Sequence, residues 1–232
     1  FKQKTAYEIG VRLVGSEMCI RDRCYIGKKR FEKAIEELKD QFEFEIDYKA
    51  FELHPEIQDS STNLKEYLIS KYGDSDRVES MTDQVIASAA EEGITMEFSE
   101  NKIVPNTLLA HKLLKLIIDK TLKAKVKEAL LKAYFTDNIN VGLQKKVYEI
   151  GKTAGVPDLI LNDFMTNTDV SEVKNEENFY RNAGVNAVPS FIINDKHLVQ
   201  GAQNTETFIK AFQQIGNPTP PKNSYEPGSG CC

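Results

Sequence analysis

Hydrophobic residues recur at two different periods along the chain, and the changes of period divide it into parts. In residues 25–42 the period is helical, with apolar positions at Phe31, Ala34, Ile35, Leu38 and Phe42. Residues 44–50 then alternate strictly between apolar and polar, which predicts a strand with one buried face. Residues 9–14 alternate in the same way and could form another strand.

Residues 63–183 have a helical period throughout, and no strand pattern interrupts them. One short helix is predicted over 64–72, closed by Gly73, and a second around 78–89, ended by Gly93. A third opens at Pro105-Asn106, with Asn106 as its predicted N-cap. Further helices are predicted around 126–134, 143–154 and 170–183.

Strand patterns return at 189–193 and 197–202, where Asn194-Asp195-Lys196 predicts a hairpin. A final helix is predicted over 205–215, followed by a Pro-, Ser- and Gly-rich tail expected to be disordered. Strands at both ends of a helical block indicate a split α/β domain with an all-helical insertion. The expected parts are 1–60 with 184–216, the insertion 61–183, and the tail 217–232.

Charge and composition narrow the classes of function. The net charge of −5 gives no reason to expect a nucleic acid or an acidic membrane as partner. No apolar run approaches the roughly 20 residues that span a bilayer, and no secretory signal is recognisable, so a cytoplasmic location is expected. The three histidines lack metal-ligand spacing. The oligomeric state is expected to be a monomer or a homodimer.

The most informative motif is Gly184-Val185-Asn186-Ala187-Val188-Pro189, which leads directly into an apolar strand. Proline is tolerated at the first residue of a strand, and this X-Pro bond is a candidate for the cis form. A cis bond would turn the backbone of Val188 outward, where it could pair with an extended peptide. A trans proline that starts an edge strand is the alternative. Val188 and Pro189 are therefore candidate substrate-binding residues.

This motif resembles the cis-proline loop of thioredoxin-fold oxidoreductases, and Gly201-Ala202-Gln203 before the last helix resembles FrnE-type DsbA-like proteins. Four further pieces resemble the same family in the same order: Cys24-Tyr25-Ile26-Gly27-Lys28, Phe51-Glu52-Leu53-His54-Pro55, Pro105-Asn106-Thr107 with Ala110-His111, and Ala133-Tyr134-Phe135. The resemblance covers about residues 24–215. It implies an α/β thioredoxin fold with an all-helical insertion domain. It also implies a thiol–disulfide oxidoreductase that acts on protein or small-molecule disulfides, with glutathione as the one possible co-substrate and no other cofactor.

Such proteins carry Cys-x-x-Cys at the start of the first helix, where the helix dipole stabilises a thiolate. Cys24 falls at the second, resolving position, and Arg21 stands where the nucleophilic cysteine would be. Arginine is permanently protonated and cannot attack sulfur. The stretch that ends at Arg23 resembles a translated sequencing adapter, so residues up to about 23 are expected to be non-native. Cys19 could pair with Cys24 instead, and Cys231 and Cys232 follow a flexible linker.

Two other functions fit the same scaffold. One is a glutathione-dependent isomerase or transferase of the kappa-class-like branch, which places a serine at the nucleophile position, and the other is a non-catalytic peptide-binding module. Lys28, Lys29 and Arg30 are interpreted as a solvated helix face that raises the potential near Cys24. The three histidines are expected to be structural or solvated, although His111, on an amphipathic helix, could border the active cleft.

Overall fold

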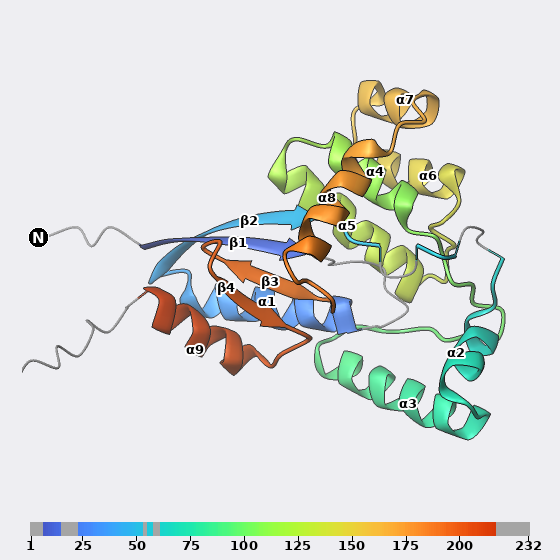
Figure 1. The fold of residues 1–232 in the computed structure, drawn as a ribbon, viewed down its shortest axis with the longest axis horizontal. Helices are drawn as coiled ribbons and strands as arrows, with labels where there is room; N and C mark the ends of the chain where they lie inside the picture. The colour runs from blue at the N-terminus through green and yellow to red at the C-terminus, as the bar shows by residue number, and fades with distance from the viewer. Residues whose placement is uncertain (1–6, 15–22, 53–54, 58–60, 217–232) are drawn as a thin grey trace, which may run out of the picture.

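A four-stranded sheet forms the centre of the computed structural model, which describes residues 7–14, 23–52, 55–57 and 61–216. The strand order is β2-β1-β3-β4. β1 (Tyr7–Val14) runs parallel to β2 (Phe42–Lys49) and antiparallel to β3 (Ser190–Ile193), and β4 (His197–Gln200) closes the sheet as the hairpin partner of β3 (Figure 1). Residues 9–14, which by their alternation could form a strand, do so within β1, and β1 lies between β2 and β3 in the sheet.

One face of the sheet is covered by α1 (Arg23–Leu38) and α9 (Thr205–Gly216), which lie together below it in Figure 1. The ring of Phe31 on α1 lies 5.1 Å from that of Phe191 on β3 and 5.7 Å from that of Phe208 on α9. Burying each of these rings contributes roughly 1.5–3 kcal/mol. The same face buries alternate residues of β1, namely Ile9, Val11 and Leu13.

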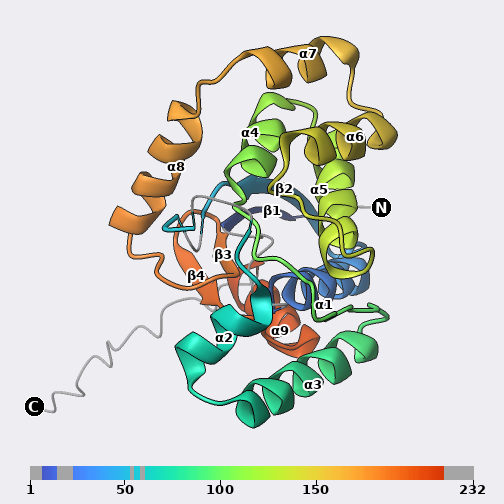
Figure 2. The same cartoon turned by 90° about the vertical axis from the view of Figure 1, so that its right-hand side faces the viewer.

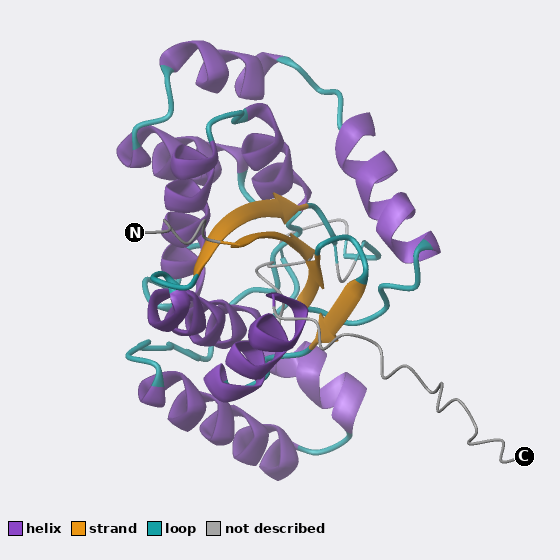
Figure 3. Cartoon of the chain, turned by 90° about the vertical axis from the view of Figure 1, so that its left-hand side faces the viewer, coloured by secondary structure: helices purple, strands orange, loops and turns teal. Residues whose placement is uncertain are grey.

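Between β2 and β3 the chain is helical, as expected. The helices are α2 (Leu64–Tyr72), α3 (Ser75–Glu91), α4 (Leu108–Leu116), α5 (Lys120–Phe135), α6 (Gln144–Ala154), α7 (Asp158–Thr166) and α8 (Ser171–Asn182). α4 to α7 share a core of their own that includes Leu113, Leu130 and Phe164. α2 and α3 lie on the opposite side of the molecule from α6 and α7, next to α1 (Figure 2). The strands are surrounded by helices (Figure 3).

Three local expectations were wrong in detail. The first helix ends at Leu38 rather than at Phe42, which begins β2. Phe42 fits the helical period of the residues before it and also the two-residue period of Phe44 and Ile46 after it. α7 was not predicted as a separate helix, although it buries Leu161 and Phe164. The N-cap of α4 is Thr107, and the Oδ1 of Asn106 accepts the Leu108 N–H at 2.9 Å.

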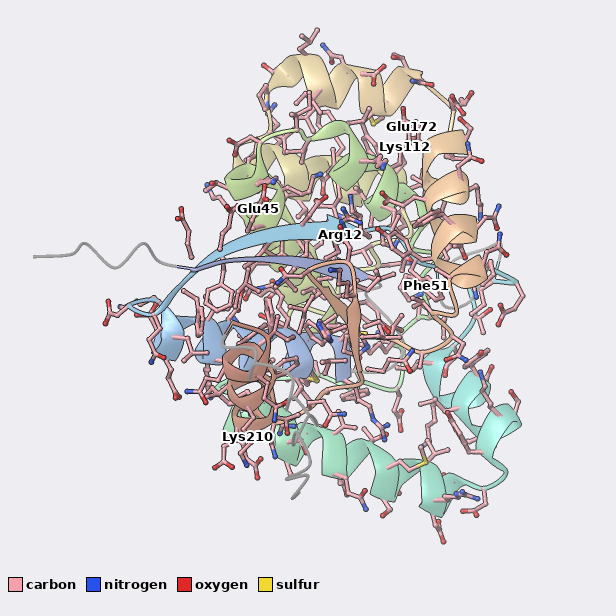
Figure 4. All side chains as sticks on the ribbon, turned by 60° about the vertical axis from the view of Figure 1, so that its left-hand side comes forward. Arg12, Glu45, Phe51, Lys112, Glu172 and Lys210 are labelled. Carbon is pink, nitrogen blue, oxygen red and sulfur yellow. The ribbon has the colours of Figure 1, made fainter. Side chains whose placement is uncertain are left out.

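Side chains of the hairpin turn between β3 and β4 bond to β1. Asn194 and Asp195 have φ values of 49° and 58°, in the left-handed region, and they lie in the three-residue turn between Ile193 of β3 and His197 of β4. Asn194 Oδ1 accepts the Gly10 N–H at 2.9 Å, while Arg12, labelled in Figure 4, pairs with Asp195 at 2.7 Å. None of the described helices is long and apolar enough to cross a membrane.

Candidate functional site

Helix α1 contributes to three hydrophobic clusters. Tyr25 and Ile26 pack into the core of the helical insertion, whereas Phe31 packs into the core under the sheet. Cys24, which is 0% exposed, belongs to a third, smaller cluster with Val14, Phe51, Tyr180, Val185 and Val188. The structure therefore brings two of the predicted site residues, Cys24 and Val188, into one cluster although they are far apart in sequence.

The loop before β3 is held in place from two sides. The Val188–Pro189 peptide bond is cis. Ser190 Oγ donates to the carbonyl of Ala187 at 2.6 Å, and the Gly201 N–H donates to the carbonyl of Pro189 at 2.8 Å. No hydrogen bond to another described residue occupies the backbone N–H or C=O of Val188. These two groups are the ones that the sequence predicted to pair with a peptide.

Gly27 allows α1 to approach this loop closely. A Cβ added at Gly27 would lie 3.0 Å from Pro189 Cγ and 3.1 Å from Ala202 Cα. Most Cβ contacts are longer than this, so any side chain at position 27 would push against the loop. The missing side chain of Gly27 thus lets the start of α1, with Cys24, lie close to Pro189 and to Gly201-Ala202-Gln203. The motif Cys24-Tyr25-Ile26-Gly27-Lys28 did not by itself reveal this role of Gly27.

The basic run that follows Cys24 is not a solvated helix face, and that interpretation was wrong. Lys28 is only 3% exposed, and its Nζ donates to Glu32 at 2.5 Å and to Glu128 of α5 at 2.6 Å. Lys29 Nζ and the Tyr25 hydroxyl also reach the Glu128 carboxylate, at 2.7 and 2.9 Å. Burial alone would raise the pKa of Glu128, but the charge and hydrogen bond of Lys28, with the bonds of Lys29 and Tyr25, lower it to about 2. One carboxylate of the insertion therefore fixes the start of α1.

Arg30 makes a second connection between α1 and the insertion. Its Nε donates to Glu92, just after α3, at 2.6 Å, and its Nη1 donates to the carbonyl of Ala202 at 3.3 Å. Lys33 also pairs with Glu92, at 2.5 Å. Burial raises the pKa of Glu92, but the two basic side chains outweigh it and lower the pKa. Arg30 therefore joins α1, the end of α3 and the turn after β4.

α8 supports the site from the other side of Cys24. Glu52 is buried next to Phe51 and pairs with Lys174 of α8, and burial raises the pKa of its carboxyl group. The guanidinium of Arg181 lies 4.3 Å from the centre of the Phe51 ring. Figure 4 shows Phe51 below the C-terminal end of α8. These contacts hold Phe51 in the cluster that contains Cys24.

A groove of about 420 Å³ opens beside the first turn of α1. One wall comes from α1 and the turn 201–203, and the other from α2, α3 and Phe98. Since this same turn contacts Gly27 and Arg30, the groove begins next to the cis-proline loop. Sequence reasoning missed this wall because the pattern at 78–89 predicted a helix but not what lies against it. The residues that line the groove are Arg23, Ile26, Arg30, Leu68, Tyr72, Val78, Met81, Thr82, Gln84, Val85, Ser88, Phe98, Gly201, Ala202 and Gln203.

The histidines do not contribute to this groove within the described part of the chain. His111 is buried beside Tyr48 and Lys127, and burial with the charge of Lys127 lowers its pKa well below the usual value. His111 is therefore a buried residue of the insertion, and it does not line this groove. His197 is exposed at the start of β4. No three described His, Cys, Asp or Glu side chains are grouped so as to hold a metal ion.

Several predictions concern residues that the structure does not describe. Cys19, Arg21, His54, Cys231 and Cys232 all lie outside the described residues, as does the predicted tail. The proposed nucleophile position and the pairing of Cys19 with Cys24 therefore remain predictions. The limits of the two predicted domains also remain predictions.

Comparisons with known proteins agree with this architecture. The profile of the DSBA-like thioredoxin domain family matches residues 23–213. A probable DsbA oxidoreductase from Streptomyces coelicolor is 26% identical, with a TM-score of 0.81 over 91% of this chain and 92% of that one. No curated protein matches the sequence.

Two more distant structures share the fold alone. A 2-hydroxychromene-2-carboxylate isomerase is 13% identical, with a TM-score of 0.63 over 90% of this chain and 95% of its own. The cytosolic disulfide reductase DsbM from Pseudomonas aeruginosa, determined with glutathione, is 8% identical, with a TM-score of 0.59 over 89% and 98%.

Proposed function

Because the chain belongs to the DSBA-like thioredoxin domain family, we propose that it is a thiol–disulfide oxidoreductase acting on protein or small-molecule disulfides. The observation that carries the proposal is the cluster that joins Cys24, at the start of α1, to Val188 of the cis-proline loop. A sulfur at a helix N-terminus is stabilised as a thiolate by the helix dipole. The backbone of Val188 would hold the substrate chain opposite that sulfur.

In this mechanism Cys24 is the resolving cysteine. A cysteine thiolate at position 21, three residues before Cys24, attacks one sulfur of a substrate disulfide. This attack forms a mixed disulfide and releases the other substrate sulfur as a thiolate. The Cys24 thiolate then attacks the protein sulfur of the mixed disulfide. This forms an intramolecular disulfide and releases the second substrate thiolate. The substrate gains two electrons and the protein loses two, and the reverse sequence oxidises a dithiol.

The chain as written has Arg21 at the attacking position, so we expect little dithiol exchange from it. The Arg21→Cys variant should restore a Cys-x-x-Cys sequence with Cys24. We expect this variant to reduce insulin in the presence of dithiothreitol at least about tenfold faster than the parent chain, because it can resolve its own mixed disulfide.

The matched control is Arg21→Cys combined with Cys24→Ser. It should react once with a disulfide peptide and accumulate the mixed disulfide, which mass spectrometry detects as an added peptide mass. If folded Arg21→Cys protein is no faster than the parent, Cys24 is not a resolving cysteine and the proposal fails. Exchange by the parent at ordinary dithiol-enzyme rates would contradict the role assigned to position 21.

A further inference from the structure

A small chamber lies where the end of β2 meets helices α4, α5 and α8. Its volume is about 30 Å³, and it shares no lining residue with the groove beside α1. In Figure 1 the arrowhead of β2 points toward these three helices. The residues that line the chamber are Tyr48, Lys49, Ala50, His111, Leu114, Lys115, Lys123, Lys127 and Glu176.

Positive charge predominates in this chamber, because four of its lining residues are lysines and only Glu176 among them carries a carboxylate. Glu176 Oε1 lies 2.8 Å from Lys115 Nζ and 3.7 Å from Lys49 Nζ. Its Oε2 accepts the Ala50 N–H at 2.8 Å. One carboxylate is therefore divided between two ammonium groups and a backbone donor.

A second carboxylate, that of Asp47, compensates the lysines only in part. Asp47 Oδ2 lies 2.5 Å from Lys49 Nζ, whereas Oδ1 lies 4.0 Å from Lys123 Nζ, at the limit of an ion pair. Burial lowers the pKa of Lys123, Asp47 acts against this effect, and the charges of Lys49 and Lys115 lower the pKa further. The ammonium of Lys123 thus lies close to other positive charges, with little negative charge beside it.

Lys127 adds a deeply buried positive charge to the same place. It is 3% exposed, and its Nζ lies 4.7 Å from the centre of the Tyr48 ring. Burial and the charge of Lys127 hold the pKa of His111 well below its usual value, so the imidazole is neutral and the lysines supply the charge of the chamber. Ammonium groups gathered at low exposure cost free energy, which an anion between them would offset.

We propose that this chamber binds a free inorganic oxyanion with the size and charge of phosphate, held among the ammonium groups of the four lysines. A volume of about 30 Å³ holds roughly two water molecules, or one tetrahedral oxyanion, and leaves little room for the organic part of a phosphate ester. Lysine suits such a ligand because its ammonium is a compact charge with three donors. The site is independent of the redox chemistry proposed for Cys24.

Thermal unfolding of the parent chain tests this site without any redox reaction. Inorganic phosphate at about 10 mM should raise the melting temperature by about 3–5 °C relative to chloride at the same ionic strength, as expected for a dissociation constant near about 1 mM. Glycerol phosphate should raise it much less, because its organic part does not fit the chamber. Equal melting temperatures in phosphate and chloride would overturn the proposal, and equal shifts by phosphate and glycerol phosphate would overturn the assignment to a free ion.

Two lysines of α5 provide matched variants. Lys123→Met removes a lysine that lines the chamber, whereas Lys120→Met removes one that pairs with Glu45 and does not line it. The phosphate-dependent shift should fall below about 1 °C in Lys123→Met and stay complete in Lys120→Met. If Lys123→Met does not fold, Lys115→Met replaces it with the same expected loss. Equal shifts in the chamber variant and in Lys120→Met would show that phosphate acts on stability in general, and the site would be excluded.

Replacing the carboxylate of the chamber should act in the opposite direction. Glu176→Gln removes the charge that competes with an anion for Lys115 and Lys49, while the glutamine oxygen can still accept the Ala50 N–H. Phosphate should therefore bind about fivefold more tightly to Glu176→Gln, measured from the dependence of the melting temperature on phosphate concentration. Unchanged or weaker phosphate binding by this variant would contradict an anion held among the lysines.

Discussion

Replacing Glu128 by glutamine is expected to weaken the connection between α1 and α5 and to remove a pH-dependent part of the stability. The carboxylate of Glu128 accepts from Lys28, Lys29 and the Tyr25 hydroxyl at 2.6–2.9 Å. Glutamine has nearly the same shape and can keep one hydrogen bond, but it carries no charge. Lys28, which is 3% exposed, would then keep Glu32 as its partner among the described carboxylates.

The magnitude follows from the pKa of Glu128, which the fold lowers from 4.5 to about 2. A difference of this size corresponds to roughly 3 kcal/mol between the two protonation states. The side chain is 34% exposed, so solvent screening reduces the expected contribution to about 1–2 kcal/mol. Because the folded pKa lies below the unfolded value, this stabilisation is complete above pH ~4.5 and is lost as the pH falls toward 2.

Urea unfolding of the parent chain and of Glu128→Gln, at several pH values between 7 and 3, measures this contribution. The free energies of unfolding should differ by about 1–2 kcal/mol at pH 7, and the difference should shrink as the pH falls below 4.5. Glu36→Gln is the control, because Glu36 of α1 forms an exposed pair with Lys39, just after the helix, and the urea midpoint of this variant should not move. A difference at pH 7 that stays constant down to pH 3 would refute the reasoning from the charge of Glu128.

Two further substitutions test the packing around the site and in the insertion. Gly27→Ala should gain about 1 kcal/mol from the higher helix propensity of alanine but lose about 1–3 kcal/mol to crowding against Pro189 and Ala202. The urea midpoint of unfolding should therefore fall. An unchanged or higher midpoint would show that the loop moves aside without cost. Burial lowers the pKa of Lys102, whose Nζ donates to the Tyr134 carbonyl, from 10.5 to about 8. The unfolded chain therefore binds more protons between those pH values, and the parent should gain stability as the pH rises through this window. Lys102→Met should lack that gain, and the same rise in both proteins would exclude Lys102 as its cause.

The sequence was most informative where a pattern depends on the backbone alone. Alternation at 9–14 indicated that a strand could form there, because successive side chains on a strand point to opposite faces. The proline after Val188 was informative because its missing N–H restricts where it can lie in a sheet. Both features could be predicted without knowledge of the distant residues around them.

Partners that are far away in the chain could not be predicted. Lys28 and Lys29 follow each other on a helix and resemble a solvated face, since nothing nearby in sequence indicates that Glu128 lies opposite them. The helical spacing of apolar residues at 78–89 predicted α3, but such spacing does not reveal what covers the apolar residues. The groove is thus a property of how α2 and α3 lie against α1.

The central position of β1 has a consequence for how the protein reaches this structure. β1 pairs with β3, so the chain that leaves the sheet at Lys49 must return at Ser190 before the sheet is complete. Closing such a long loop costs conformational entropy before any strand contact compensates for it, and contacts of this range slow folding. Helices α4 to α7 are close in sequence and share their own core, so they can form early and shorten the effective loop. Folding of the insertion would then set the rate at which Cys24 and the cis-proline loop are brought together.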